Sequence, residues 1–117
     1  MALESNPLVS VIIHSYNRFE YLLNALESVI NQTYSNFEII LINDDSEEEE
    51  YYTHKFSNKI KKIDIDRKKF PAWPGSRQAL INIGSENSKG KYLAFLDDDD
   101  IWLPTKLEIQ INTMIKN

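Results

Sequence analysis

The chain has 117 residues, of which 42% are hydrophobic and 26% charged, with a formal net charge of -5 and no cysteine. This length predicts one domain, and the composition is that of an ordinary globular protein. The lack of cysteine excludes disulfides and thiolate metal sites, and the acidic balance argues against a general nucleic-acid binder.

The first half of the chain predicts two buried strands with a helix between them. The apolar, β-branched runs at 8–13 (LVSVII) and 37–42 (FEIILI) are typical of strands covered on both faces. A helix is predicted from Asn17 to about residue 31, because its apolar residues share one face. Asn17 is expected to cap this helix, with Glu20 completing a variant of the capping box.

The second half predicts two more strands and three helices. In chain order these are a short helix to Phe56, a half-exposed strand at 59–65, a loop at 66–76, a helix at 77–87, a strand at 92–96 and a last helix that begins near Pro104 and turns Leu107, Ile111 and Met114 inward. This alternation predicts an α/β fold, a Rossmann-like parallel sheet of about four strands flanked by helices, in a single domain over residues 1–117.

No apolar run approaches the ~18 residues of a transmembrane helix, and the first residues lack the pattern of a signal peptide. Both observations favour a cytoplasmic protein. The lysine-rich stretches Lys59–Lys62 and Arg67–Lys69 leave a peripheral membrane or partner patch as an alternative, although solvated lysines explain them as well.

Polar and acidic residues follow three of the predicted strands, at 14–17 (HSYN), 43–46 (NDDS) and 97–100 (DDDD). Ligands of parallel sheets bind beyond the carboxyl ends of the strands, so these segments are expected to meet. Two like charges repel by about 1 kcal/mol at ~4 Å in water, which makes four consecutive aspartates costly unless a cation is present. Mg²⁺ takes one or two carboxylates together with phosphate oxygens, so a divalent cation holding a phosphate ligand is expected here.

Other metal and phosphate sites fit the spacing less well. A calcium loop counted from Asp97 would place Trp102 where a glycine must turn, and neither GxGxxG nor a P-loop occurs. A phospho-accepting receiver domain of similar size remains as an alternative, although its acidic pair would follow the first strand. A non-catalytic nucleotide-binding module is a further alternative.

Several motifs together resemble a known family. VSVIIHSYNR, QTYSNFE, INDDS and GKYLAFLDDDD before a proline resemble the nucleotide-binding half of family 2 glycosyltransferases with the GT-A fold, over 9–108. The chain departs from the family's frequent Pro-Thr at His14-Ser15, and its four aspartates leave the register of the metal ligand open by one residue.

The resemblance implies a nucleotide site and a metal site. The implied nucleotide-binding residues are Ser15, Tyr16, Asn17, Asp44, Asp45, Arg77, Asp97 and Asp98. Asp44 would read the base, usually uracil, and Tyr16 would stack near it. Asp99, with Asp97, would hold the Mn²⁺ or Mg²⁺ that bridges the diphosphate.

The resemblance also implies an activity. This is transfer of a sugar, with inversion, from a nucleoside-diphosphate sugar (UDP-linked by expectation) to a hydroxyl of a saccharide or other acceptor. The catalytic base and the acceptor-binding half would lie beyond Asn117. The chain is therefore interpreted as the donor-binding half, which binds UDP with metal but transfers nothing alone, and which could pair with a second copy.

Overall fold

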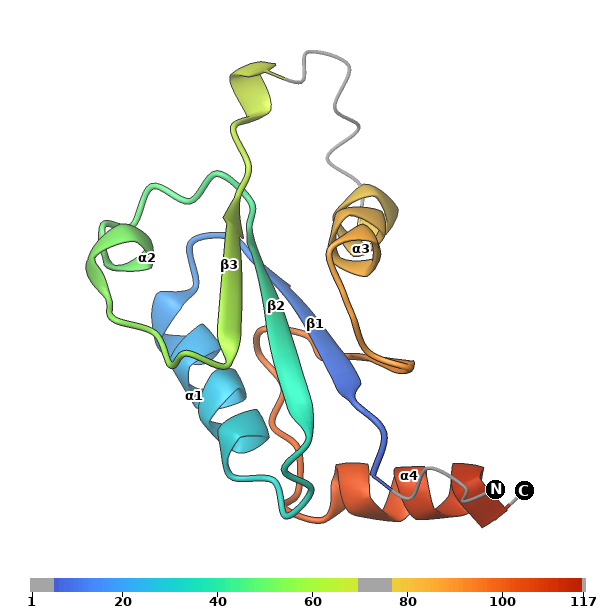
Figure 1. Ribbon diagram of the computed structural model, residues 1–117. Helices are drawn as coiled ribbons and strands as arrows, with labels where there is room; N and C mark the ends of the chain where they lie inside the picture. Colours follow the sequence, from blue (N-terminus) through green and yellow to red (C-terminus); the bar gives the residue numbers. More distant parts are fainter. Residues whose placement is uncertain (1–5, 70–76, 117) are drawn as a thin grey trace.

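The computed structural model describes residues 6–69 and 77–116. In these residues four strands form one sheet in the order β3-β2-β1-β4, and every neighbouring pair is parallel. The elements in chain order are β1 (Val9–Ser15), α1 (Phe19–Ile30), β2 (Phe37–Asn43), α2 (Glu50–Thr53), β3 (Ile60–Asp64), a 3₁₀ turn (Arg67–Lys69), α3 (Arg77–Glu86), β4 (Tyr92–Phe95) and α4 (Lys106–Lys116). Figure 1 shows α1 and α3 on opposite faces of the sheet. The predicted α/β fold is confirmed.

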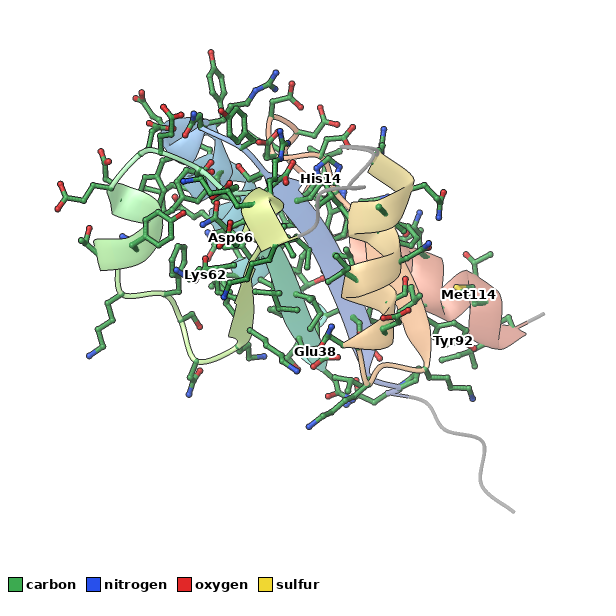
Figure 2. All side chains as sticks on the ribbon, turned by 90° about the horizontal axis from the view of Figure 1, so that it is seen from above. His14, Glu38, Lys62, Asp66, Tyr92 and Met114 are labelled. Atoms are coloured by element: carbon green, nitrogen blue, oxygen red, sulfur yellow. The ribbon has the colours of Figure 1, made fainter. Side chains whose placement is uncertain are left out.

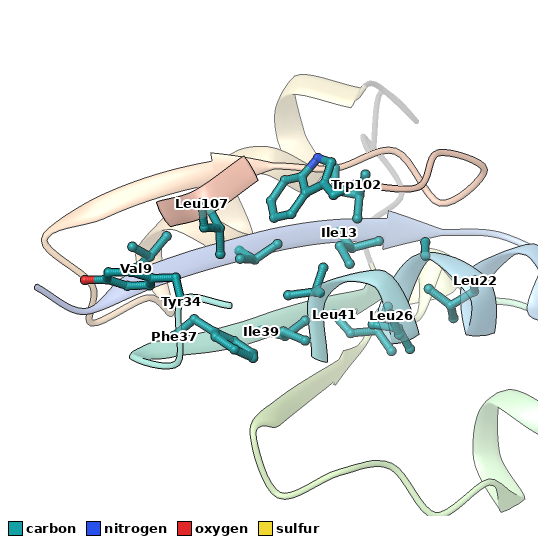
Figure 3. Packing of buried hydrophobic residues seen from close by; sticks show 14 of the residues in the cluster. Val9, Ile13, Leu22, Leu26, Tyr34, Phe37, Ile39, Leu41, Trp102 and Leu107 are labelled. Carbon is teal, nitrogen blue, oxygen red and sulfur yellow. The ribbon is translucent and has the colours of Figure 1, made fainter. Parts of the chain in front are cut away.

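The alternation of side chains along β1 and β2 builds two apolar layers. The larger layer lies on the face covered by α1 and contains Val9, Ile13 and Leu41, together with Trp102 and Leu107 (Figure 3). The smaller layer lies on the face covered by α3. Since both faces of the two central strands are buried, their sequences are continuous apolar runs without polar alternation.

α3 approaches the sheet closely because it carries a glycine at the contact. A Cβ atom added at Gly84 would lie 2.5 Å from Cγ2 of Ile12 in β1. Only a residue without a side chain lets the helix backbone approach this near. The close packing holds the first residue of α3, Arg77, beside the carboxyl-terminal edge of the sheet.

The predicted cap of α1 is wrong. The N-cap residue is Arg18, which makes no side-chain cap bond, whereas Asn17 has a φ of 49° in the left-handed region that asparagine tolerates. Oδ1 of Asn17 accepts instead from the backbone N–H groups of Glu47 and Glu48 in the loop after β2. Oε1 of Glu48 in turn accepts from the N–H of Phe19, so a distant loop caps the helix.

Two further boundaries and the exposure of one residue differ from the sequence-based prediction. α2 ends at Thr53 rather than Phe56, and α4 begins at Lys106, two residues after Pro104. Met114, expected on the inner face of α4, is 46% exposed, because α4 buries only Leu107 and Ile111 fully. The predicted loop at 66–76 lies outside the described residues from position 70 onward.

The strand order locates the ligand-binding edge. The chain runs outward from β1 through β2 to β3 and then crosses back to place β4 on the other side of β1. The order therefore reverses between β1 and β4, and ligands of such sheets bind beyond the carboxyl ends of the strands at this point. Within the described part of the chain, no helix has the length and apolar character needed to cross a membrane.

Candidate functional site

A cavity of about 440 Å³ lies at the carboxyl ends of β1, β2 and β4. Its lining residues are His14, Tyr16, Arg18, Asp44, Arg77, Leu80, Asp97, Asp98 and Asp99. These residues come from the three segments after the strands, from the start of α1 and from α3. The structure thus brings six of the implied site residues together, namely Tyr16, Asp44, Arg77, Asp97, Asp98 and Asp99.

Three of the consecutive aspartates form an oxygen-rich cluster. One carboxylate oxygen from each of Asp97, Asp99 and Asp100 lies within 4.8 Å of the others. Carboxylate oxygens are the ligands that Mg²⁺ and Mn²⁺ prefer, so this donor set fits a hard divalent cation. Asp98 points elsewhere, because its Oδ2 accepts a hydrogen bond of 2.8 Å from Oγ of Ser15.

Arginines already offset part of the repulsion between these acids. Nη2 of Arg77 lies 2.8 Å from Oδ1 of Asp97, and Nη1 of Arg18 lies 3.2 Å from Oδ2 of Asp99. The pattern of acids had predicted a metal alone as the source of this relief, and a role for Arg18 was not predicted. The same strand-end rule that selected residues 14–17 would have found Arg18 by extending one residue further.

Asp44 is paired at the β2 side of the cavity. The residue is only 4% exposed, and Arg67 donates to both of its oxygens, from Nε at 3.1 Å and from Nη2 at 2.5 Å. The hydrogen bonds that Arg67 donates to Asp44 raise the pKa of Arg67 above its ordinary value, against the opposing effect of desolvation. The guanidinium of Arg67 also lies 5.3 Å from the ring centre of Tyr16, which is 44% exposed. Arg67 was not anticipated, although it lies three residues after β3 and a parallel sheet brings the end of this strand to the same edge.

A chain of hydrogen bonds supports the floor of the site from α2. The hydroxyl of Tyr51 lies 2.6 Å from Oγ of Ser15 and accepts from the N–H of Arg18 at 2.9 Å. An ionised carboxylate can only accept, so Ser15 donates to Asp98 and Tyr51 donates to Ser15. Burial raises the pKa of Asp98 above its ordinary value, and the hydrogen bond from Ser15 counteracts part of this shift.

His14 differs from its neighbours in the cavity. Among the buried side-chain nitrogen and oxygen atoms of the described residues, its Nε2 is the one without a hydrogen-bond partner. Figure 2 shows His14 at the carboxyl end of β1. Residues 14–17 were predicted to lie at this edge of the sheet, but no binding role was predicted for His14 itself.

Three implied nucleotide-binding residues lie outside the lining of the cavity, namely Ser15, whose hydrogen bonds are given above, Asn17 and Asp45. Asn17 connects the turn after β1 to the loop after β2, as described above. Asp45 has a φ of 59°, and its Oδ2 accepts from the N–H of Arg67 at 3.3 Å. Asn17 and Asp45 therefore fix the conformation of the loops that surround the cavity, and their contact with a nucleotide stays a prediction.

Comparison with protein families gives a match over almost the whole chain. Residues 10–117 match the family model described as glycosyl transferase family 2. An uncharacterized glycosyltransferase of Rickettsia bellii is 45% identical over 109 residues, which are 93% of this chain and 15% of that protein. The UDP-Glc:alpha-D-GlcNAc-diphosphoundecaprenol beta-1,3-glucosyltransferase WfgD of Escherichia coli is 38% identical over 94% of this chain and 42% of its own length.

Solved structures share the fold. The crystal structure of residues 1–349 of S. aureus TarS in complex with UDP-GlcNAc superposes with a TM-score of 0.76 at 22% identity, covering 92% of this chain and 31% of that chain. The likeness shows that the sheet and its helices are those of a GT-A glycosyltransferase. The chain spans less than half the length of each of these proteins.

Proposed function

Because this chain belongs to glycosyl transferase family 2, we propose that it binds the nucleoside diphosphate and the metal ion of a sugar-nucleotide donor. The observation that carries the proposal is the meeting of Asp44, Tyr16 and the aspartates 97–99 in one cavity at the switch point of the sheet. Asp44 can accept hydrogen bonds from a base, the exposed ring of Tyr16 can stack on one, and the carboxylate cluster can bind a metal ion. A nucleotide with a metal-bound diphosphate is a ligand that uses all three.

The order of the strands gives the ligand a direction. Asp44 follows β2 and Asp97–Asp99 follow β4, with β1 between them. Neighbouring strands lie about 4.8 Å apart, so the two ends of the cavity are separated by roughly 10 Å. We place the base over Asp44 and Tyr16, and the diphosphate over the end of β4.

The residues at the β4 side fit a divalent metal. Asp99 and Asp97 would hold Mn²⁺ or Mg²⁺, and Asp100 offers a third oxygen within the same 4.8 Å cluster. When bound, such a metal acts as a Lewis acid that stabilises charge on a leaving diphosphate. Arg18 and Arg77 line the same cavity and would donate to phosphate oxygens, for which guanidinium groups are well suited.

The donor and acceptor classes are drawn from similarity. The name of WfgD specifies a UDP-glucose donor, and the TarS structure contains UDP-GlcNAc. A UDP-sugar is therefore the proposed donor, and a hydroxyl of a saccharide, such as the lipid-diphosphate-linked sugar in the name of WfgD, the proposed acceptor. An inverting course and a carboxylate base supplied by residues beyond 117 complete the proposal. The 117-residue chain would then bind the donor without transferring the sugar.

The receiver alternative does not agree with the topology. Receiver domains have the strand order 2-1-3-4-5, in which the first strand lies between the second and the third. In this chain β1 lies between β2 and β4. The segment after β1 also carries His14 and Tyr16 where a receiver would require acids.

Titration calorimetry with UDP and Mn²⁺ tests the proposal. We expect heat of binding that disappears with EDTA and is strongly reduced by Asp99→Asn. The matched control is Glu86→Gln, which removes one negative charge from the exposed end of α3, away from the cavity. Metal-independent binding, or equal binding by Asp99→Asn and the control, would refute the proposal.

A further inference from the structure

The two edge strands of the sheet differ in charge. β3 forms one edge and carries Lys61, Lys62 and Asp64, whereas β4 at the other edge has the sequence Tyr-Leu-Ala-Phe, without a charged residue. Charged side chains, lysine above all, are one means by which natural proteins prevent an edge strand from pairing with another chain. β4 lacks this protection, so its edge is a surface to which a further strand can add.

Two residues of β4 direct their backbone groups away from the sheet. The N–H groups of Tyr92 and of Leu96, which follows β4, donate to carbonyl groups at the β1 side. Backbone groups alternate in direction along a strand, so the N–H and C=O groups of Leu93 and Phe95 point outward. In the part of the chain that the structure describes, β4 pairs with no strand other than β1.

The same two residues expose apolar side chains. Leu93 and Phe95 are 41% and 47% exposed, and they lie on the α3 face of the sheet, since Phe95 is the register partner of Ile12. The apolar layer beneath α3 contains residues of β1, β2 and β3 but, among those described, none of β4. α3 therefore leaves the β4 side of this face uncovered.

We propose that the β4 strands of two copies of this chain pair antiparallel about a two-fold axis at Ala94, so that the two sheets become one. In this register Leu93 of one copy lies opposite Phe95 of the other, and each such pair exchanges two backbone hydrogen bonds. The contact is isologous, so the axis forms both pairs at once. Apolar pairs directly opposite each other stabilise antiparallel strands. The proposal does not depend on the nucleotide site.

The residues that flank β4 have complementary charges. Lys91 precedes the strand and Asp97 follows it closely. Antiparallel pairing brings Lys91 of one copy to the end at which Asp97 of the other copy lies, so opposite charges meet at both ends of the contact. Asp97 has two oxygens, and can accept from Lys91 of the other copy as well as from Arg77 of its own. The lysines on the β3 edge disfavour further pairing, so association ends with two copies.

Sedimentation velocity of the 117-residue chain over a range of concentrations measures the association. We expect a species of twice the 13.7 kDa mass of the monomer. Phe95→Lys should weaken dimerisation by about tenfold or more, because the axis places two added charges in one contact. Leu93→Pro removes an outward N–H group without removing a bond to β1, and it should also weaken the dimer. The matched control is Tyr21→Lys, at a 61% exposed residue of α1, and thermal melting establishes that each variant is folded.

A single cysteine tests the register. The chain has no cysteine, so Ala94→Cys introduces one thiol in each copy. At the axis the two residues 94 form a non-hydrogen-bonded pair with Cα atoms about 4.5 Å apart, which is within reach of a disulfide, so mild oxidation should give a covalent dimer. Leu93→Cys should not cross-link, because residue 93 of the other copy lies two positions further along the strand.

Two results would overturn the proposal. The first is a monomer at every concentration, or a dimer that Phe95→Lys weakens no more than the control does, and either would leave the β4 edge to a strand from another polypeptide segment. The second is equal cross-linking at positions 93 and 94, which would exclude the axis at Ala94.

Discussion

Tyr51 links α2 to the candidate site, although its ring is completely buried and lies outside the cavity. Its hydroxyl joins Oγ of Ser15 at 2.6 Å to the N–H of Arg18 at 2.9 Å. Ser15 then holds Asp98 at 2.8 Å. Tyr51→Phe removes one oxygen atom and leaves the ring packing against Phe19 unchanged. The substitution therefore isolates the contribution of the hydrogen-bond chain.

The expected loss of stability follows from the number of bonds broken. Each intramolecular hydrogen bond contributes about 0.5–1.5 kcal/mol net, and two are lost, so the free energy of unfolding should fall by about 1–3 kcal/mol. The value belongs in the upper part of this range because the hydroxyl is buried and water does not replace it without rearrangement. Ser15 also loses one of its two partners, so Asp98 is less firmly positioned and affinity for UDP with Mn²⁺ should fall as well.

Urea unfolding followed by circular dichroism measures the first effect, and calorimetry with UDP and Mn²⁺ measures the second. Tyr52→Phe is the matched control, because the neighbouring hydroxyl makes one bond of 2.7 Å to the carbonyl of Ser46 and Tyr52 is half exposed. It should cost less than Tyr51→Phe and leave binding unchanged. A Tyr51→Phe variant that unfolds at the wild-type urea concentration and binds UDP normally would refute the reasoning.

Three further substitutions address the charged groups of the site. Burial raises the folded-state pKa of Asp98 above that of the unfolded chain, so ionisation of Asp98 lowers the free energy of unfolding as the pH rises toward the folded-state value. The variant Asp98→Asn should therefore be more stable than wild type at neutral pH in EDTA. Urea unfolding should show that this difference disappears in acid. Asp44→Asn should weaken UDP binding about tenfold and reduce the preference for UDP over CDP in competition calorimetry, since an amide does not replace a carboxylate as an acceptor on both oxygens. Arg18→Gln should strengthen binding of Mn²⁺ alone, because Arg18 pairs with Asp99 at 3.2 Å, yet weaken binding of UDP with Mn²⁺, and both affinities can be measured by calorimetry.

The sequence predicted well whatever depends on local pattern. β1 and β2 were found because strands covered on both faces must be continuously apolar, and Phe37–Asn43 has its apolar residues almost fully buried. The meeting of the segments after β1, β2 and β4 was predicted too, since segments after parallel strands lie at one edge whatever the details of packing. Neither inference required knowledge of which side chains touch.

Hydrogen-bond partners that lie far apart in the sequence could not be predicted from it. Asn17 has the composition of a helix cap, but the loop at 46–48 lies close enough to bind it, and these contacts between distant segments prevailed. Tyr51 reads as an ordinary residue of a short helix, and its partner Ser15 is 36 residues away. Arg67 likewise reaches Asp44 across 23 residues. Such pairings leave no periodic signal in the sequence.

The ion pairs of Arg77 and Arg18 couple the binding of the metal to the binding of the nucleotide. Arg77 and Arg18 lie against Asp97 and Asp99, so the carboxylates that would bind a metal are partly neutralised before it arrives. A nucleoside diphosphate brings further negative charge to the same edge, and two arginines cannot serve the acids and the diphosphate fully at once. If the carboxylates of Asp97 and Asp99 held a divalent cation, Arg77 and Arg18 would be free to donate to phosphate oxygens instead. Metal and nucleotide should therefore bind with positive coupling, and by linkage the factor by which Mn²⁺ raises the affinity for UDP must equal the factor by which UDP raises the affinity for Mn²⁺.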